Sequence, residues 1–244
     1  LPPIWEQNGE WPFLLGTDTQ GRDILSAILY GTRISIVIGI ASVALSLLIG
    51  MTAGLMAGFF GGFVDNLLMR IGDVTLSIPT ILIAILVYTV VRQMLPPGLR
   101  EAGSAAVLIL AIAISTWVQY ARTVRAQAIV EAGKDYVHAA RLIGVPARRI
   151  MAKHILPNTL TPIMVAATLN FGMAILTEAT LSFLGIGMPP SQPSLGTLIR
   201  IGNQFLFSGS WWIVLFPVIQ LCLLVVAVNL LGDWLRDALN PKLR

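Results

Sequence analysis

Few side chains in this sequence are of a type that does acid–base, nucleophilic or metal chemistry, and several lie in one polar stretch, residues 135–157. The only two histidines, His138 and His154, lie sixteen residues apart there, with no cysteine or carboxylate at a spacing typical of a metal site. The single cysteine, Cys222, falls in the last apolar run and is expected to be a small core residue. The pattern argues against an intramembrane enzyme and against a bound metal.

A different chemistry is suggested by Glu178, the one carboxylate placed well inside an apolar region. An ionisable group within a membrane span is costly and by default indicates a functional site. Two roles stay open: a transient partner for a positively charged group that passes through the membrane, or a structural partner for a cationic group of a neighbouring subunit. Asn170 and Thr177 are the other polar candidates for lining a pathway.

Membrane-spanning helices must position these groups. The chain of 244 residues is 56% hydrophobic and only 11% charged, whereas soluble domains are about 25% charged. Crossing about 30 Å of hydrocarbon takes roughly 20 helical residues, and the apolar runs lack the alternation of barrel strands. The sequence predicts an all-α polytopic membrane protein with five visible spans: residues 34–60, 74–91, 102–121, 155–177 and 201–232, the last with its core at 211–231.

The distribution of basic residues predicts the orientation. Eleven of the 16 Lys and Arg residues fall on one side of the predicted spans, seven of them between residues 122 and 153. The positive-inside rule places that loop and the tail, residues 233–244, on the cytoplasmic side. Residues 1–33 then lie outside, and because they contain no signal peptide, a sixth span is expected upstream of Leu1.

The membrane-spanning region, residues 34–232, is flanked by the outer segment 1–33, in which residues 24–30 are expected to form a short amphipathic surface helix. A longer outer loop is expected at residues 185–210, ending at interfacial tryptophans. In the second span, Pro79 removes a backbone donor and predicts a kink. Arg70 and Asp73, at i and i+3, predict an ion pair on one helix face.

A row of small residues runs along the first span. Such rows let two helix backbones approach closely in lipid. They predict a packing seam within the subunit or with a partner, with pore lining as the weaker alternative. The row consists of Ser42, Ser46, Gly50, Gly54, Gly58 and Gly62.

The stretch 135–157 has the pattern of two short helices that meet at a bend. Gly144 is expected to end the first helix and Pro146 to begin the second, with Leu156-Pro157 ending the pair. An ordinary basic loop explains the charges but not this arrangement, which predicts a rigid knob seated in another protein. The apolar stripe of the first helix would be Tyr136, Ala139, Ala140 and Ile143, and that of the second Ile150, Met151, His154 and Ile155.

With these residues identified, the sequence resembles the permease subunits of binding-protein-dependent ABC importers. Their signature is Glu-Ala-Ala, three residues, Gly, nine residues, Ile, one residue, Leu-Pro. It is matched at Ala139, Ala140, Gly144, Leu156 and Pro157, while His138 and His154 replace the Glu and the Ile. The segments 16–23, 30–35 and 229–241 are similar to the C-type permeases of the dipeptide, oligopeptide and nickel group.

The resemblance implies the type I importer permease fold, a homologous B-type permease partner, two ATPase subunits and a periplasmic or lipid-anchored substrate-binding protein. It also implies that the ATPases contact His138, Ala139, Ala140, Arg141, Gly144 and Val145. The expected cargo is di- or oligopeptides, with nickel or other metal chelates and glutathione-like molecules as alternatives.

No Gly-x-x-x-x-Gly-Lys-Ser/Thr motif occurs in the sequence. ATP and Mg²⁺ are therefore expected on the partner ATPases, and this chain is expected to be no enzyme and to bind no cofactor or nucleic acid of its own. A secondary transporter, the distant alternative, would usually show paired halves and ionisable relays near the midplane. Five visible spans with one buried acid fit that alternative poorly.

Overall fold

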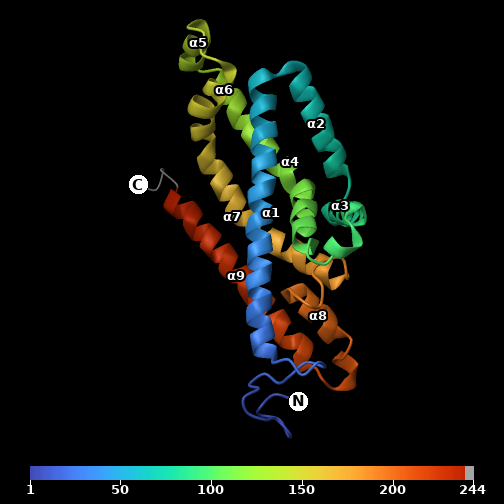
Figure 1. The fold of residues 1–244 in the computed structure, drawn as a ribbon. Coiled ribbons are helices and arrows are strands. Elements are labelled where there is room, and N and C mark those ends of the chain that lie inside the picture. Colours follow the sequence, from blue (N-terminus) through green and yellow to red (C-terminus); the bar gives the residue numbers. More distant parts are fainter. Residues whose placement is uncertain (240–244) are drawn as a thin grey trace.

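The computed structural model describes residues 1–239, which form helices joined by short turns (Figure 1). No strand occurs in this range, where four helices are long and apolar enough to cross a membrane, or five spans if α2 and α3 count as one. The all-α polytopic prediction is confirmed. In chain order the helices are α1 (Ile24–Phe60), α2 (Gly62–Ser77), α3 (Thr80–Met94), η1 (Pro97–Leu99), α4 (Ser104–Ala132), α5 (Asp135–Leu142), α6 (Ala147–Ile150), the π-helical turn η2 (Met151–Ile155), α7 (Leu156–Phe183), α8 (Leu195–Asn203), η3 (Leu206–Ser208) and α9 (Trp212–Leu239).

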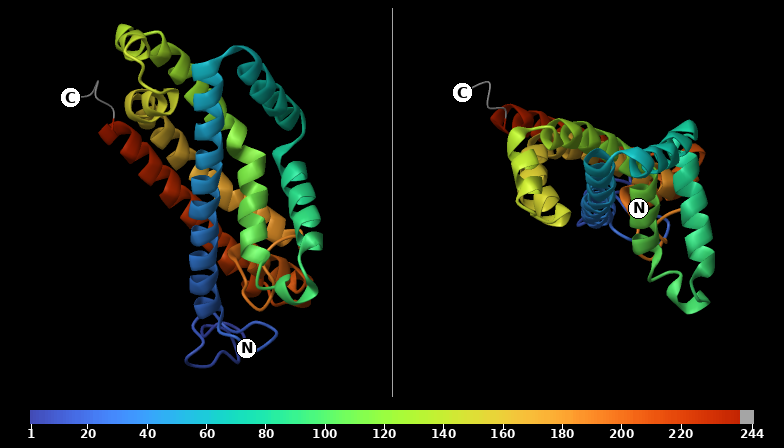
Figure 2. Two further views of the ribbon diagram at one scale, coloured as in Figure 1. Left: turned by 45° about the horizontal axis from the view of Figure 1, so that its top comes forward. Right: turned by 90° about the horizontal axis from the view of Figure 1, so that it is seen from above.

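The molecule has two distinct ends. One end carries α5 and the turn from α1 to α2, and is called the α5 end; the opposite end carries residues 1–23 and α8, and is called the N-terminal end (Figures 1 and 2). The spanning helices run between them, as the alternating topology predicted from the sequence requires. The predicted tail, residues 233–244, forms the last turns of α9 up to Leu239, and its remainder lies outside the described residues.

Helix α1 is longer than the predicted first span, because residues 24–30 are its first two turns. The expectation of a separate surface helix there is wrong. The Asp23 carboxylate caps the helix by accepting a hydrogen bond from the Ser26 amide. Ile24 and Ile28 then pack in a buried cluster with Leu195 of α8, and this contact holds the first turns in line with the rest of α1.

The row of small residues on α1 packs against α4, which lies beside it (Figure 2). A Cβ atom added to Gly54 would lie 2.5 Å from the Ala121 carbonyl oxygen, and one added to Gly58 would lie 2.6 Å from the Ala128 Cβ. The predicted seam is therefore an internal one, of the close type that small residues permit. Gly62 does not take part, since it belongs to α2.

The second predicted span consists of two helices, α2 and α3, with a bend of 101° between them. Ile78 is extended, at φ −106° and ψ 135°, as a residue before proline prefers. The helix is thus broken at Pro79 rather than only kinked as predicted.

Ion pairs between α2 and α4 replace the predicted pair of Arg70 with Asp73. The Asp73 carboxylate instead accepts a hydrogen bond from Arg122 at 2.6 Å. One turn further along α4, the guanidinium of Arg125 donates to both carboxylate oxygens of Asp65 on α2. Contacts with a neighbouring helix thus prevailed over the local i, i+3 spacing.

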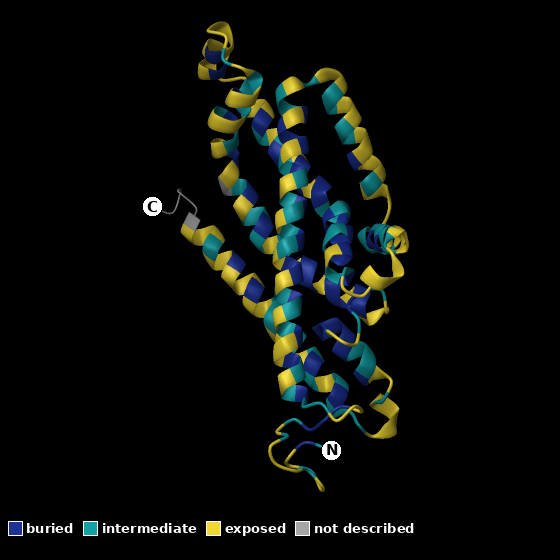
Figure 3. Cartoon of the chain, in the orientation of Figure 1, coloured by how far each residue is buried: buried dark blue, intermediate teal, exposed yellow. Residues whose placement is uncertain are grey.

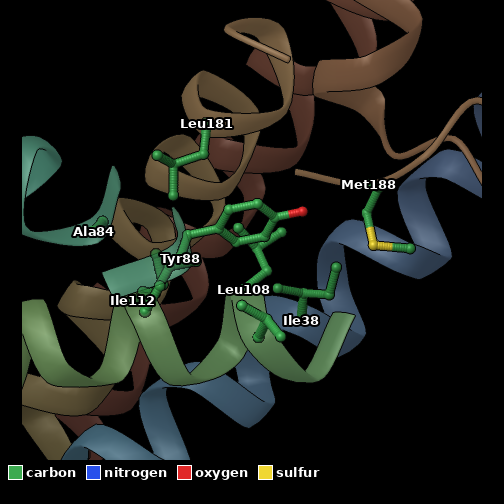
Figure 4. Close-up of a cluster of buried hydrophobic side chains, with 10 residues drawn as sticks. Ile38, Ala84, Tyr88, Leu108, Ile112, Leu181 and Met188 are labelled. Carbon is green, nitrogen blue, oxygen red and sulfur yellow. The ribbon is translucent and has the colours of Figure 1, made fainter. Parts of the chain in front are cut away.

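The N-terminal end contains a helix, α8, that was not predicted, although Ser194 and the spacing of Leu195, Leu198 and Ile199 are typical of a short amphipathic helix. Within the expected loop 185–210, Ser194 caps α8, and Leu195 and Leu198 of α8 are buried. Figure 3 shows how buried and exposed residues alternate along the helices. Helix α9 begins at Trp212, one residue after the start of the predicted span core. The largest buried apolar cluster lies between α1, α3, α4 and α7, and surrounds Tyr88 (Figure 4).

Candidate functional site

The polar stretch folds into a protruding elbow, residues 135–150, at the α5 end (Figure 1). Helix α5 ends in a Schellman motif, in which the Val145 amide donates to the Ala140 carbonyl at 3.0 Å and the Gly144 amide donates to the Arg141 carbonyl at 3.1 Å. Gly144 has φ +78°, the left-handed conformation that favours glycine. Its predicted role as helix terminator is confirmed. Pro146 was expected to be the first residue of the second helix, and α6 begins one residue later, at Ala147.

The face that α5 buries differs from the predicted one. Val137 and Ala140 are buried and pack with Ile150 and Ile155, whereas Ala139 and Ile143 face outward. Of the predicted stripe, only Ala140 is buried. Helix α5 has only about two turns, so the 3.6-residue period alone cannot determine which face is buried. The packing of Val137 against α4 determines it instead. On the second helix the prediction holds better, because Ile150 and Ile155 are fully buried.

Two large apolar side chains project from the tip of the elbow. Leu142 is 89% exposed and Ile143 is 80% exposed, directly before the Gly144 turn. His138 and Ala139 are also exposed on α5. Adjacent exposed apolar side chains on a braced projection are typical of a protein contact. Leu142 was not among the residues predicted to contact the ATPases, although its position two residues before Gly144 was a usable signal.

The elbow continues into α7 without a break. Pro157 was expected to end the helical pair, and that expectation is wrong: η2 leads directly into α7. The turn is wide, because the Leu156 amide donates to the Met151 carbonyl five residues earlier. Pro157 has no amide hydrogen to donate, and a local π-helical turn lets the helix continue despite the missing hydrogen bond. The elbow is therefore joined to a spanning helix by continuous helical backbone.

A polar network that sequence reasoning missed braces the base of the elbow. The nearly buried Glu131 carboxylate, at the end of α4, accepts hydrogen bonds from Lys134 Nζ at 2.6 Å, Tyr136 Oη at 2.7 Å and Asn158 Nδ2 at 3.2 Å. Lys134 directly precedes α5, Tyr136 lies in the first turn of α5, and Asn158 lies in the first turn of α7. The hydrogen bond to Glu131 also raises the pKa of the Lys134 ammonium, so the pair stays ionised at neutral pH. An acid at the end of a long apolar helix was the only sequence signal.

The predicted ATPase contacts divide into two groups in the structure. His138, Ala139 and Gly144 are accessible. Ala140 and Val145 pack inward with the buried face of α5. The Arg141 guanidinium lies over the Phe59 ring, 4.5 Å from its centroid, and so braces α5 against the end of α1.

Glu178 lies near the N-terminal end, far from the elbow, and is fully buried. Its two carboxylate oxygens accept hydrogen bonds from Ser35 Oγ and Ser182 Oγ, both at 2.7 Å. Ser35 Oγ also accepts a hydrogen bond from the Leu195 amide, which begins α8, at 3.4 Å. Within the chain this carboxylate joins α1, α7 and α8. The two roles considered for Glu178, a partner for a peptide amino terminus or for a cationic group of a neighbouring subunit, stay predictions.

Asn170 and Thr177, the other pathway candidates, line one shared cavity of about 110 Å³. The cavity lies between α1, α3, α4 and α7, and Glu178 does not line it. Its remaining polar lining consists of Thr80, Thr116, Gln119 and Tyr120. The structure thus brings two of the three candidates together and separates the third. Among residues 1–239, no group of three or more His, Cys, Asp or Glu side chains is arranged to hold a metal ion.

Comparison with known proteins extends this picture. Residues 46–244 match the family model described as binding-protein-dependent transport system inner membrane component. The chain is 42% identical over 243 residues to the di/tripeptide transport system permease protein DppC of Pseudomonas aeruginosa, covering 100% of this chain and 77% of that protein. It is 43% identical over 244 residues to the dipeptide transport system permease protein DppC of Haemophilus influenzae, covering 100% and 79%.

Solved structures share the fold. An inward-facing structure of the MetNI methionine ABC transporter has a chain with a TM-score of 0.64 at 21% identity, covering 88% of this chain and 97% of that one. A chain of an amino acid ABC transporter has a TM-score of 0.60 at 16% identity, covering 88% and 94%. At these identities the likeness concerns the fold alone, whereas the family match covers most of the sequence. This chain therefore belongs to the family of binding-protein-dependent transport system inner membrane components.

Proposed function

We propose that this chain is the C-type permease of an ATP-driven importer that moves di- or oligopeptides across a bacterial inner membrane. A homologous B-type permease would complete the pathway, and a substrate-binding protein outside would deliver the cargo. The peptide assignment is supported by relatives at 42% and 43% identity whose names specify di- and tripeptide or dipeptide transport. Metal chelates and glutathione-like molecules are the competing cargoes.

The observation that carries the coupling proposal is the exposed tip, Leu142 and Ile143, on a braced elbow. We infer that two ATPase subunits bind the elbows of the two permeases on the cytoplasmic side, where the C-terminus would also lie. A partner shifts a conformational equilibrium only through contacts that differ between the two states. The Glu131 network and the continuous passage into α7 give such contacts a stiff route to the spanning helices.

The chain itself would catalyse no reaction. Phosphoryl transfer relies on donors that cradle the phosphates and on a metal ion, and the motif that provides them is absent from the sequence. ATP and Mg²⁺ would therefore bind to the ATPase subunits. This chain would convert their closure into movement of helices.

Co-purification and reconstitution test this function. A tagged copy, expressed with its neighbouring genes, is expected to purify with a second permease and two ATPase subunits. In proteoliposomes, the loaded binding protein should stimulate both ATP hydrolysis and uptake of a labelled dipeptide. Competition by unlabelled dipeptide, nickel chelate or glutathione identifies the cargo. Uptake of solute by this chain reconstituted alone would refute the proposal.

A further inference from the structure

The break between α2 and α3 places the start of a helix beside the cavity lined by Asn170 and Thr177. Thr80, the first residue of α3, lines that cavity. No side chain caps the helix, and the Leu82 and Ile83 amides both use the Pro79 carbonyl as their acceptor. The first amides of a helix have no partner within it and carry a partial positive charge. In the interior of a membrane protein, such a start is suited to binding a negatively charged group.

A second, independent feature is the hydroxyl of Tyr120, which lines the same cavity from α4. Tyr120 is only 1% exposed, and its buried oxygen has no hydrogen-bond partner in good geometry among the described residues. The Asn170 side chain is close enough to interact with this hydroxyl, but at a geometry short of a regular hydrogen bond. A buried hydroxyl without a partner is costly. A ligand that accepts its hydrogen bond would remove that cost.

The other lining groups narrow the chemistry of the ligand. The hydroxyls of Thr116 and Thr177 already donate to carbonyls of their own helices. The free donors are therefore the start of α3, the Tyr120 hydroxyl and the amides of Gln119 and Asn170. Neither a basic nor an acidic side chain lines the cavity. Neutral donors favour an anionic oxygen group without holding it as tightly as a guanidinium would, which suits a group that must leave again.

We propose that this cavity is a transit subsite for the carboxylate at the C-terminus of the cargo peptide. The inference rests on the proposed function as a peptide permease and adds the part of the substrate that this chain recognises. The volume of about 110 Å³ is suited to a carboxylate and its neighbouring atoms rather than to a whole oligopeptide. Side chains of the cargo would lie outside the subsite, so the same subsite serves peptides of different sequence.

The test compares L-alanyl-L-alanine with its C-terminal amide, using the complete importer in nanodiscs without the binding protein. Saturation-transfer NMR, which detects weak binding, is expected to show the acid binding at least fivefold more tightly than the amide. Tyr120→Phe, which removes only the hydroxyl, should weaken binding of the acid about fivefold and leave the amide unchanged. Asn170→Ala provides a second variant. Equal binding of acid and amide, or unchanged binding of the acid in both variants, overturns the inference.

Tyr88→Phe is the matched control. Tyr88 is a buried tyrosine within the apolar cluster (Figure 4). Its hydroxyl donates to the Gly187 carbonyl at 2.9 Å, and Tyr88 does not line the cavity. This variant should bind the acid like the unmodified complex. ATP hydrolysis stimulated by loaded binding protein reports whether each variant is assembled. The further inference alone fails if the unmodified importer hydrolyses ATP and takes up dipeptide while the subsite variants bind the acid as tightly as the unmodified importer. The proposed function itself fails if the unmodified importer takes up no dipeptide.

Discussion

Two glutamates show how differently the two ends of this molecule use a carboxylate. Glu178, near the N-terminal end, is fully buried and is held by serine hydroxyls from α1 and α7. Glu131, at the base of the elbow, is held by a half-exposed lysine, a tyrosine and an asparagine. The first network closes a packed interior. The second supports a projection whose tip is left for another protein.

The difference has an energetic consequence. In a dry interior, a polar group that loses its partner keeps the full cost of desolvation, so a buried network is expensive to break. At the elbow, Lys134, the partner of the nearly buried Glu131, is half-exposed, so water can replace it if it is lost. Exposed ion pairs contribute about 0–1 kcal/mol. Substitutions at the N-terminal end should therefore affect stability, whereas those at the elbow should affect coupling at nearly unchanged stability.

The largest effect is expected for Glu178→Ala. It leaves the hydroxyls of Ser35 and Ser182 buried without their acceptor, which should cost about 3 kcal/mol, roughly 100-fold in the folding equilibrium. Thermal unfolding in detergent measures the loss. Glu101→Ala is the control, since the exposed Glu101 accepts a hydrogen bond from Ser191 at the surface. Equal stability losses in the two variants would erase the contrast between the networks.

Next in size is Leu142→Glu at the tip of the elbow, which is 89% exposed. A charge placed in an apolar contact must be desolvated without a partner, so dipeptide uptake should fall about tenfold or more. The amount of permease in the membrane should not change. Phe207→Glu, at a residue that is 99% exposed outside the elbow, is the control and should transport normally. Normal uptake by the Leu142 variant would remove the tip from the coupling contact.

A moderate effect is expected for Gly144→Ala. Space is not limiting, since nothing lies within 4 Å of the added Cβ, but at φ +78° the new side chain costs about 1 kcal/mol. The Schellman turn should fray, and uptake should fall about fivefold by this shift in local equilibrium. Amide hydrogen exchange at Val145 reports the fraying directly. Gly98→Ala, also without close neighbours and at an ordinary φ, should change neither quantity.

The smallest effect is expected for Tyr136→Phe, which removes one of the three hydrogen bonds to Glu131. Lys134 keeps the carboxylate paired, so the number of peptides imported per ATP should fall only about two- to threefold, in line with a net loss near 0.5 kcal/mol. Uptake and ATP hydrolysis measured in the same proteoliposomes give this ratio. Tyr30→Phe, at an exposed tyrosine near the N-terminal end, should leave it unchanged. A ratio equal to that of the unmodified importer would show that the network does not stiffen the elbow.

Features that depend on many residues or on one special residue could be predicted from the sequence. Most spans follow from long apolar runs, the existence of a packing seam from a repeated small residue, and the end of α5 from Gly144. That the seam is internal was left open. These signals are local or are averaged over many turns. They do not depend on which distant segment packs against them.

Features decided by distant contacts could not be predicted. Helix α8 is buried against α7, α9 and the first turns of α1, and its own nine residues do not specify which of these segments cover its apolar face. The same holds for the face that α5 buries and for the partners of Asp73. The cavity beside Thr80 was equally hidden, although two of its residues were named, because it forms only where α3, α4 and α7 meet.

The length of α1 has a consequence for how it can be contacted. At 37 residues it measures about 55 Å at 1.5 Å per residue, whereas the hydrocarbon layer is about 30 Å thick. Even a tilted helix of that length reaches past the lipid tails. Residues 24–33, which precede the predicted first span, supply part of this excess at the N-terminal end. A protein outside the membrane can therefore touch α1 directly at that end without entering the hydrocarbon.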